Sequence, residues 1–343
     1  MAQNTNKLDE YRPTVKAQYF TPVKGFLEFI GKPYSEINKK DLELFLVQIE
    51  NERTRYGYHM AIRHFFKWLN DGQLPEHLYI KAGAPKFRET YKPGDMWEEK
   101  EVLLAIETRD NDRDKALIAT IYDLAGRTHE VLDLKIDDIA FRDNYAEVML
   151  TDHTGQRVLP IIFAYPYLLK WINNHPLKNK KNAPLWVTLK GVPRKISYEG
   201  IHGLFAKMER QLKDQIKKPF KSYVLRHSRL THYADVVTEF QMRKIAGWTM
   251  RSNMPQRYLH MSMKGVKETL LEHHGITKRE NKGTILVPKK CPRCQSLNTT
   301  DAKFCEKCTL SLTLGAWEES RLEQDELKEQ LRMLCVAKVL FLS

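Results

Sequence analysis

Four of the five cysteines lie in one short segment, and their spacing is suited to holding a metal ion. Cys291 and Cys294 form one Cys-x-x-Cys pair, and Cys305 and Cys308 form a second pair after ten intervening residues. Zinc takes four soft ligands in a tetrahedron, and each pair offers two thiolates at a suitable bite. A structural zinc ribbon that folds around its metal is predicted, because four thiolates leave no position for a catalytic water. The alternatives are a redox pair or chance spacing, and Cys335 stands outside the pattern.

Three further stretches combine a possible nucleophile with cationic and aromatic side chains: Arg127 with Glu130 in GRTHEVLDL, Arg226 with His227 in LRHSRLTHYA, and Trp248 ten residues before Tyr258 in GWTMRSNMPQRYLH. Taken singly, Arg127 and Glu130 could be a surface ion pair, and Trp248 could be a core residue. In this order, the stretches resemble the first-arginine, second-arginine and nucleophile boxes of the tyrosine recombinases, the phage-type integrases. The resemblance covers about residues 10–275.

The resemblance implies a specific reaction on DNA. Enzymes of this family cut one strand by attack of tyrosine on a phosphodiester, which leaves a 3′-phosphotyrosine and a free 5′-hydroxyl, without ATP or a catalytic metal. Tyr258 is then the nucleophile, and the guanidinium groups of Arg127 and Arg226 bind the nonbridging phosphate oxygens. Trp248 stands where the family has His or Trp, and its indole N–H can donate to the same phosphate. His227 is interpreted as supporting structure rather than as a catalyst.

Two positions depart from the family's pattern. The second box usually begins with His three residues before the arginine, and Tyr223 stands there, either as a core residue or as a phosphate donor. The family also carries a lysine on a β-hairpin turn as general acid for the 5′-oxygen. In DHTGQR the matching position is His153, and histidine, with an ordinary pKa of about 6.5, can serve as a general acid.

The elements that must position these residues are mainly helical. Apolar residues recur at helical spacing through three segments before residue 80, whereas NYAEVMLTDHTGQRVLPIIF reads as a β-hairpin whose turn contains Gly155. We expect a mainly α fold with an α+β catalytic domain and a small sheet. The expected domains are a helical core-binding domain at 1–80, a basic linker at 81–95, a catalytic domain at 96–275, the zinc ribbon at 286–312 and an amphipathic helix at 313–343.

Charge and hydropathy indicate the class of partner. The formal net charge is +13, which favours a polyanion such as nucleic acid. No apolar run approaches the ~20 residues of a membrane span, and the polar start has no signal-peptide core, so a cytoplasmic, nucleoid-associated protein without membrane contact is expected. The resemblance further implies double-stranded DNA attachment sites, a homotetramer on DNA and accessory proteins as partners.

Four functions are compatible with these features. The leading prediction is a site-specific recombinase or integrase that integrates or excises a mobile element, with a ribbon and tail of a kind that looks archaeal. Chromosome resolution would use identical chemistry. A catalytically weak or inactive DNA-binding regulator that keeps the fold is the alternative favoured by the departures at Tyr223 and His153. A zinc-ribbon adaptor for protein partners would leave the three boxes unexplained.

Overall fold

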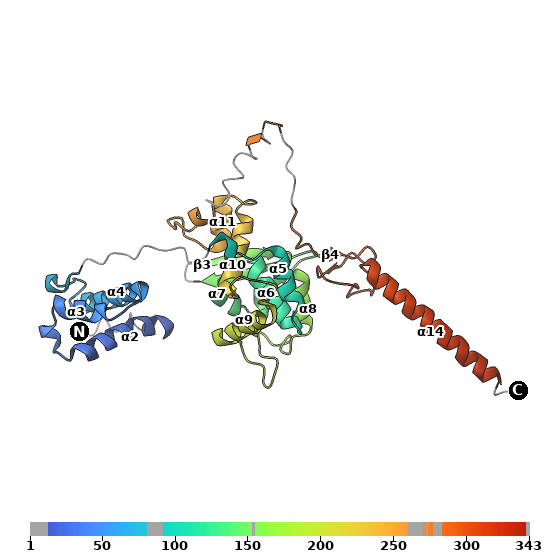
Figure 1. The fold of residues 1–343 in the computed structure, drawn as a ribbon, viewed down its shortest axis with the longest axis horizontal. Coiled ribbons are helices and arrows are strands. Elements are labelled where there is room, and N and C mark those ends of the chain that lie inside the picture. Colours follow the sequence, from blue (N-terminus) through green and yellow to red (C-terminus); the bar gives the residue numbers. More distant parts are fainter. Residues whose placement is uncertain are drawn as a thin grey trace. The chain divides into compact units, whose positions relative to one another are not determined.

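The computed structural model describes residues 13–80, 92–152, 155–259, 270–271, 274–276 and 283–340 (Figure 1). The chain divides into two compact units, Met1–Thr90 and Tyr91–Ser343. Within the described ranges, no helix combines the length and the apolarity that crossing a bilayer requires. Both units are built mainly from helices, with small antiparallel sheets in the second, which confirms the predicted fold class.

The described part of the first unit, residues 13–80, packs three α-helices around one apolar cluster. These are α2 (Pro13–Ile30), α3 (Lys39–Val47) and α4 (Glu52–Leu69), with the 3₁₀ turns η1 (Tyr34–Glu36) and η2 (Glu76–Leu78). Asn38 caps α3 in a capping box with Asp41, because its side chain accepts the N–H groups that have no partner inside the helix. The buried cluster comprises Val23, Phe26, Ile37, Leu42, Phe45, Leu46, Ile62, Phe66 and Leu78.

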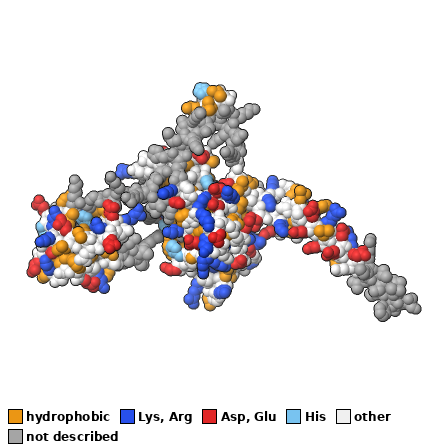
Figure 2. Space-filling model, in the orientation of Figure 1, with side chains coloured by type: hydrophobic (Ala, Val, Ile, Leu, Met, Phe, Trp, Pro, Cys, Tyr) orange, Lys and Arg blue, Asp and Glu red, His pale blue; other side chains and the backbone are white. Residues whose placement is uncertain are grey.

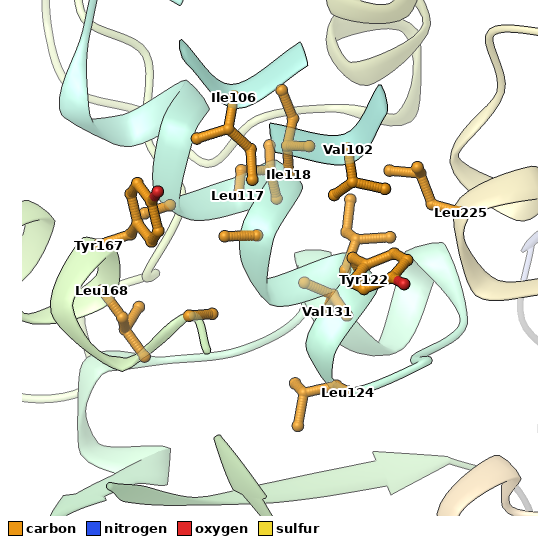
Figure 3. Packing of buried hydrophobic residues seen from close by; sticks show 14 of the residues in the cluster. Val102, Ile106, Leu117, Ile118, Tyr122, Leu124, Val131, Tyr167, Leu168 and Leu225 are labelled. Atoms are coloured by element: carbon orange, nitrogen blue, oxygen red, sulfur yellow. The ribbon is translucent and has the colours of Figure 1, made fainter. Parts of the chain in front are cut away.

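Helices of the second unit surround α6, whose side chains are buried along most of its length. The helices are α5 (Glu99–Glu107), α6 (Asp112–Asp123), α7 (Thr128–Leu132), α8 (Tyr165–Asn173), α9 (Tyr198–Leu212), α10 (Ser222–Tyr233), α11 (Glu239–Ala246) and α12 (Gln256–Leu259), with 3₁₀ turns η3 (Pro93–Asp95) and η4 (Ile136–Asp138). Figure 3 shows side chains of α5, α6, α8 and α10 meeting in one cluster, with Ile118 and Tyr122 of α6 among them.

A three-stranded antiparallel sheet lies beside these helices, in the order β1 (Ile139–Phe141), β2 (Ala146–Asp152), β3 (Gly155–Ile161). The predicted hairpin is formed by β2 and β3, and the pairing of Asp152 with Gly155 leaves residues 153–154 as its connection. Gly155 is therefore the first residue of β3 rather than part of the turn. Its φ of +122° lies in the region that favours glycine. Strand β1 was not anticipated from the sequence.

The cysteine segment folds against the helices of the second unit. Strands β4 (Lys289–Lys290) and β5 (Leu297–Asn298) pair with each other, and α14 (Leu314–Leu340) follows. Leu286, just before β4, is 3 % exposed and belongs to the main core. Lys170 of α8 forms an ion pair with Glu306 at 2.7 Å. These contacts fasten the segment to the second unit.

Candidate active site

Three arginines converge on the C-terminal end of α11. This helix ends at Gly247, which adopts a left-handed conformation with φ +64°. The last carbonyls of a helix lack intrahelical partners and carry partial negative charge, so cations are stabilised there. Three successive carbonyl oxygens each accept from one guanidinium group: Ile245 O from Arg157 Nε at 3.2 Å, Ala246 O from Arg226 Nη2 at 2.7 Å, and Gly247 O from Arg127 Nη2 at 2.9 Å.

Arg127 is held by the tight junction between α6 and α7. A Cβ on Gly126 would lie 2.7 Å from Val131 Cγ2, so a side chain there would clash. Arg127 is the N-cap of α7, where its backbone N–H donates to Glu130 Oε2 at 2.8 Å and its Nη1 donates to Glu130 Oε1 at 2.6 Å. Glu130 thus both completes the cap and orients the guanidinium. The Arg127 side chain keeps 23 % exposure, which leaves it accessible to a ligand.

Two buried carboxylates lie among these cations. The side chains of Glu130 and Asp152 are both 0 % exposed. Arg127 Nη1 donates to Asp152 Oδ2, while Arg157 Nη2 pairs with Glu130 Oε2 at 2.7 Å. Buried charges are tolerated when each is paired and hydrogen-bonded. Arg127, Arg157 and Arg226 together outnumber the two carboxylates by one charge, so the site keeps a net positive charge that suits an anion.

Arg157 and Asp152 were not among the residues predicted from the sequence. A signal for both exists in the period of the strands. Burial alternates along β2 and β3, and Asp152 and Arg157 occupy inward-facing positions in line with Leu150 and Leu159. A charged residue at an inward position of an alternating strand requires a partner inside the protein. The alternation alone does not identify that partner.

Arg226 lies deeper than Arg127 and is 4 % exposed. Its Nη1 donates to Ala125 O at 2.6 Å, in addition to the bond with Ala246 O. Burial, together with the neighbouring charge of Arg127, lowers the pKa of Arg226 to about 10. A bound anion would offset both effects, because it would supply the missing counter-charge.

Tyr258 of α12 is 2 % exposed and lies in a ring stack beside the arginines. Its ring lies 5.6 Å from that of His227 and 5.5 Å from that of Trp248, with interplanar angles of 20° and 24°. The Tyr258 hydroxyl is hydrogen-bonded to His227 Nδ1. Tyr223, 46 % exposed, sets its ring edge-to-face on His227 at 4.1 Å. From the sequence, His227 was interpreted as supporting structure only, and its direct contact with the Tyr258 phenol was not predicted.

Of the predicted site residues, Trp248 lines an open cavity and also stacks on Tyr258. Tyr258 belongs to the same buried cluster as Ala125 and Ala246, whose carbonyls hold Arg226. A cavity of about 200 Å³, open to solvent, is lined by Gly155, Gln156, Arg157, Arg243, Lys244, Gly247, Trp248 and Thr249. His153 lies outside the described residues, between Asp152 and Gly155. The arrangement can bind an anion beside a phenol whose hydroxyl has a basic partner.

The four cysteines form a separate cluster. Their sulfur atoms lie within 4.8 Å of one another, and the contacts Cys291–Cys308 and Cys294–Cys305 both measure 3.5 Å. A disulfide would bring two sulfurs to about 2.05 Å. Sulfurs around a tetrahedral zinc ion, at about 2.3 Å from the metal, lie roughly 3.8 Å apart. The cluster therefore fits a metal ion better than it fits disulfides, and the predicted convergence of the cysteines is confirmed.

Comparison with known proteins agrees with this geometry. Residues 97–264 match the phage integrase family. The chain is 28 % identical over 238 residues to a tyrosine recombinase of Thermosipho africanus, covering 64 % of this chain and 78 % of that protein. It is 24 % identical over 203 residues to the tyrosine recombinase XerA of Saccharolobus solfataricus, covering 53 % and 66 %.

Solved structures share the fold. The XerH recombinase in a pre-cleavage complex with difH DNA aligns with a TM-score of 0.58 at 19 % identity, over 75 % of this chain and 79 % of XerH. A λ integrase fragment bound to a core site aligns with a TM-score of 0.54 at 13 % identity, over 73 % and 89 %. The arginine and tyrosine stretches fall in the matched region, so residues 97–264 form a phage integrase family domain that is similar to tyrosine recombinases.

Proposed function

We propose that this protein is a site-specific DNA recombinase that cleaves and rejoins DNA through a 3′-phosphotyrosine at Tyr258. The observation that carries the proposal is the convergence of Arg127, Arg157 and Arg226 on the end of α11, next to the Tyr258 cluster. A pentacoordinate phosphate transition state is anionic, and fixed guanidinium donors stabilise it without reorganising at the moment of reaction.

Each residue then has a defined part. Arg127 and Arg226 bind the nonbridging oxygens, and Trp248, which lines the cavity, donates its indole N–H to the same phosphate. His153 protonates the departing 5′-oxygen. Tyr223 remains partly exposed at the edge of the ring stack, where its hydroxyl can reach the DNA backbone. The 5′-hydroxyl later attacks the phosphotyrosine of another strand, so the bond energy is kept without ATP.

The proposed substrate is double-stranded DNA at attachment sites of a mobile element that the enzyme integrates or excises. The net charge of +13 supports a polyanionic partner, and Figure 2 shows Lys and Arg side chains gathered in a band on the second unit. Residues 1–80 are proposed as the core-binding domain, residues 81–95 as its basic linker and 96–275 as the catalytic domain. XerH and λ integrase were both solved on DNA, the λ integrase fragment as a dimer. A homotetramer on two duplexes is proposed from the resemblance to tyrosine recombinases.

We propose zinc as the metal of the cysteine cluster. The ligands would be Cys291, Cys294, Cys305 and Cys308, which supply four thiolates and no open coordination position. The ion would act structurally, by holding residues 286–312 in their folded form against α8.

A covalent trap tests the proposal. Duplexes that bind the protein are selected from a randomised library and then nicked next to each candidate cleavage position, so that the short 5′-hydroxyl fragment diffuses away. We expect a protein–DNA adduct on a denaturing gel, and no adduct with Tyr258→Phe. An adduct that survives Tyr258→Phe would contradict the assignment of the nucleophile.

Two observations favour a second candidate, a DNA-binding regulator without cleavage activity. Tyr223 occupies the position where the family has histidine, and Tyr258 is almost fully buried. Tight binding of the selected duplexes without any adduct, across every nick position, would support the regulator and exclude the recombinase.

A further inference from the structure

We propose that His227 is the group that takes the proton from the Tyr258 hydroxyl as the phenol attacks DNA. The inference rests on the proposed function and gives a catalytic role to His227, which the sequence interpretation had treated as supporting structure only. It starts from one contact, the hydrogen bond between the Tyr258 hydroxyl and His227 Nδ1, two residues that lie 31 positions apart in the chain.

The geometry keeps the two groups together. His227 lies on α10 directly after Arg226, whose guanidinium is held by two backbone carbonyls, so the helix turn that carries His227 is fixed in place. Tyr258 is 2 % exposed and lies between the rings of His227 and Trp248. The hydroxyl therefore meets a protein acceptor instead of bulk water, which favours a proton transfer inside the site.

His227 and Tyr223 differ in their ability to accept a proton. A phenol has an ordinary pKa of about 10 and accepts a proton poorly near neutral pH, whereas imidazole has an ordinary pKa of about 6.5 and is mostly neutral there. In the tautomer with hydrogen on Nε2, His227 Nδ1 accepts from the Tyr258 hydroxyl. Tyr223 touches the His227 ring by its edge at 4.1 Å, so it buttresses the imidazole.

Among the described residues, the site's arginines and carboxylates are engaged with one another or with backbone carbonyls. Arg226 is adjacent on α10, and the charge of Tyr258 is one of the interactions that raise the pKa of Arg226, so the two are electrostatically coupled. The carboxylates of the site, Glu130 and Asp152, are paired with Arg127 and Arg157. His227 is thus the imidazole in direct contact with the nucleophile.

In the proposed step, a bond forms between Tyr258 Oη and the phosphorus of the scissile phosphodiester while the bond from phosphorus to the 5′-oxygen breaks. The Oη proton moves to His227 Nδ1, and the 5′-oxygen leaves with a proton from a separate donor, the role proposed for His153. In the rejoining step His227 returns its proton to Tyr258.

Single-turnover cleavage of the nicked duplexes, followed as a function of pH, tests the role. His227→Asn keeps an oxygen near the Nδ1 position that can accept the hydrogen bond but cannot hold a proton near neutral pH. We expect cleavage to slow by about 100-fold or more, and the inflection on the acid side of the wild-type pH profile to disappear. With His227→Ala, added imidazole should raise the cleavage rate at least about tenfold over that of the same variant without imidazole. Tyr223→Phe should retain the inflection.

Control measurements separate the possible failures. His202→Asn alters another histidine in contact with a tyrosine ring, edge-to-face with Tyr198 on α9, and should leave the rate unchanged. Thermal unfolding and gel-shift affinity show whether each variant is folded and binds DNA. Absence of any wild-type adduct would refute the proposed function itself. A wild-type adduct together with an unchanged rate in His227→Asn would refute only the inference. Slower cleavage that keeps its pH inflection and resists imidazole would also overturn it, because His227 would then only position the phenol.

Discussion

Gly247 serves two purposes through one backbone conformation. Its left-handed φ of +64° ends α11, and the same residue turns its carbonyl toward Arg127. A Cβ at this position would lie 2.7 Å from Arg157 Nη1 and 3.2 Å from Arg127 Nη1. The end of the helix and the placing of two guanidinium groups therefore depend on the absence of one methyl group.

Gly247→Ala should lower both the stability of the protein and its rate of cleavage. The left-handed conformation and the displaced guanidinium groups should together cost about 1 kcal/mol or more in the free energy of unfolding. Cleavage should slow at least about tenfold, because the phosphate ligands shift. Denaturant unfolding and single-turnover kinetics measure both effects. Gly203→Ala, in α9 with nothing within 4 Å of the added Cβ, is the matched control and should be neutral or mildly stabilising.

The proposed general acid, His153, can be distinguished experimentally from the proposed base, His227. His153→Ala should block cleavage of an ordinary phosphodiester, because the 5′-oxygen would leave without a proton. A substrate with sulfur at the 5′-bridging position needs no proton, so it should restore cleavage by His153→Ala. The same substrate should not restore His227→Asn, which lacks the base. Rescue of neither variant would remove His153 from the acid role.

At the scale of elements, α10 joins the site to the core. Arg226 and His227 face the site, whereas further along the helix Arg229 pairs with Asp123 at 3.2 Å and His232 Nδ1 meets the Tyr122 hydroxyl at 2.5 Å. Burial lowers the pKa of His232 below its ordinary value, and the charge of Arg229 acts in the same direction. The neutral imidazole is thus the form that the folded protein prefers.

The stability of the second unit should consequently fall as the solution is acidified. Because the folded-state pKa of His232 is lowered, unfolding takes up a proton between that pKa and the unfolded value of about 6.5. The stabilisation is complete above about pH 7 and is lost as the pH falls through this window. His232→Asn should reduce the proton uptake on unfolding by up to about one. His175, whose pKa burial also lowers, should keep part of the dependence. Unchanged proton uptake in His232→Asn, measured from melting temperatures between pH 5 and 8, would contradict this account.

At the scale of the whole molecule, the cysteine segment contributes to the packing of the second unit. Tyr167 of α8 donates to Asp301 Oδ1 at 3.2 Å, next to the ion pair of Lys170 with Glu306. On the approach to β4, Thr284 Oγ1 donates at 2.6 Å to Glu99, the first residue of α5. These bonds connect the four-cysteine cluster to the helices that form the core.

Removal of the metal should therefore destabilise more than the segment that binds it. A strong chelator, or Cys294→Ser with Cys305→Ser, should lower the melting temperature of the second unit by several degrees, since metal binding adds to folding free energy. Cys335→Ser, outside the cluster, is the matched control and should not change metal content. Elemental analysis and calorimetry provide the readouts. A second unit that melts at the same temperature with and without metal would show that the segment is only an appendage.

Much of the site was readable from residue types and order. The arginine and tyrosine stretches indicated the family, and the spacing of Cys291, Cys294, Cys305 and Cys308 predicted their convergence. Helical periodicity predicted the mainly helical class, and alternation predicted the hairpin of β2 and β3. These features are local, because propensity, period and ligand spacing operate over a few residues along the chain.

Tertiary structure decided which of these residues touch. Arg127 and Gly247 are 120 residues apart in the chain, and Tyr258 lies 31 residues after His227, so no local pattern could pair them. The alternation of β3 marks Arg157 as inward-facing without indicating that Glu130 and Ile245 O receive its donors. The sequence by itself determined the family and the chemical groups. Only packing of α7, α10, α11 and β3 determined their partners, because a buried charge takes the partner that the fold brings within reach.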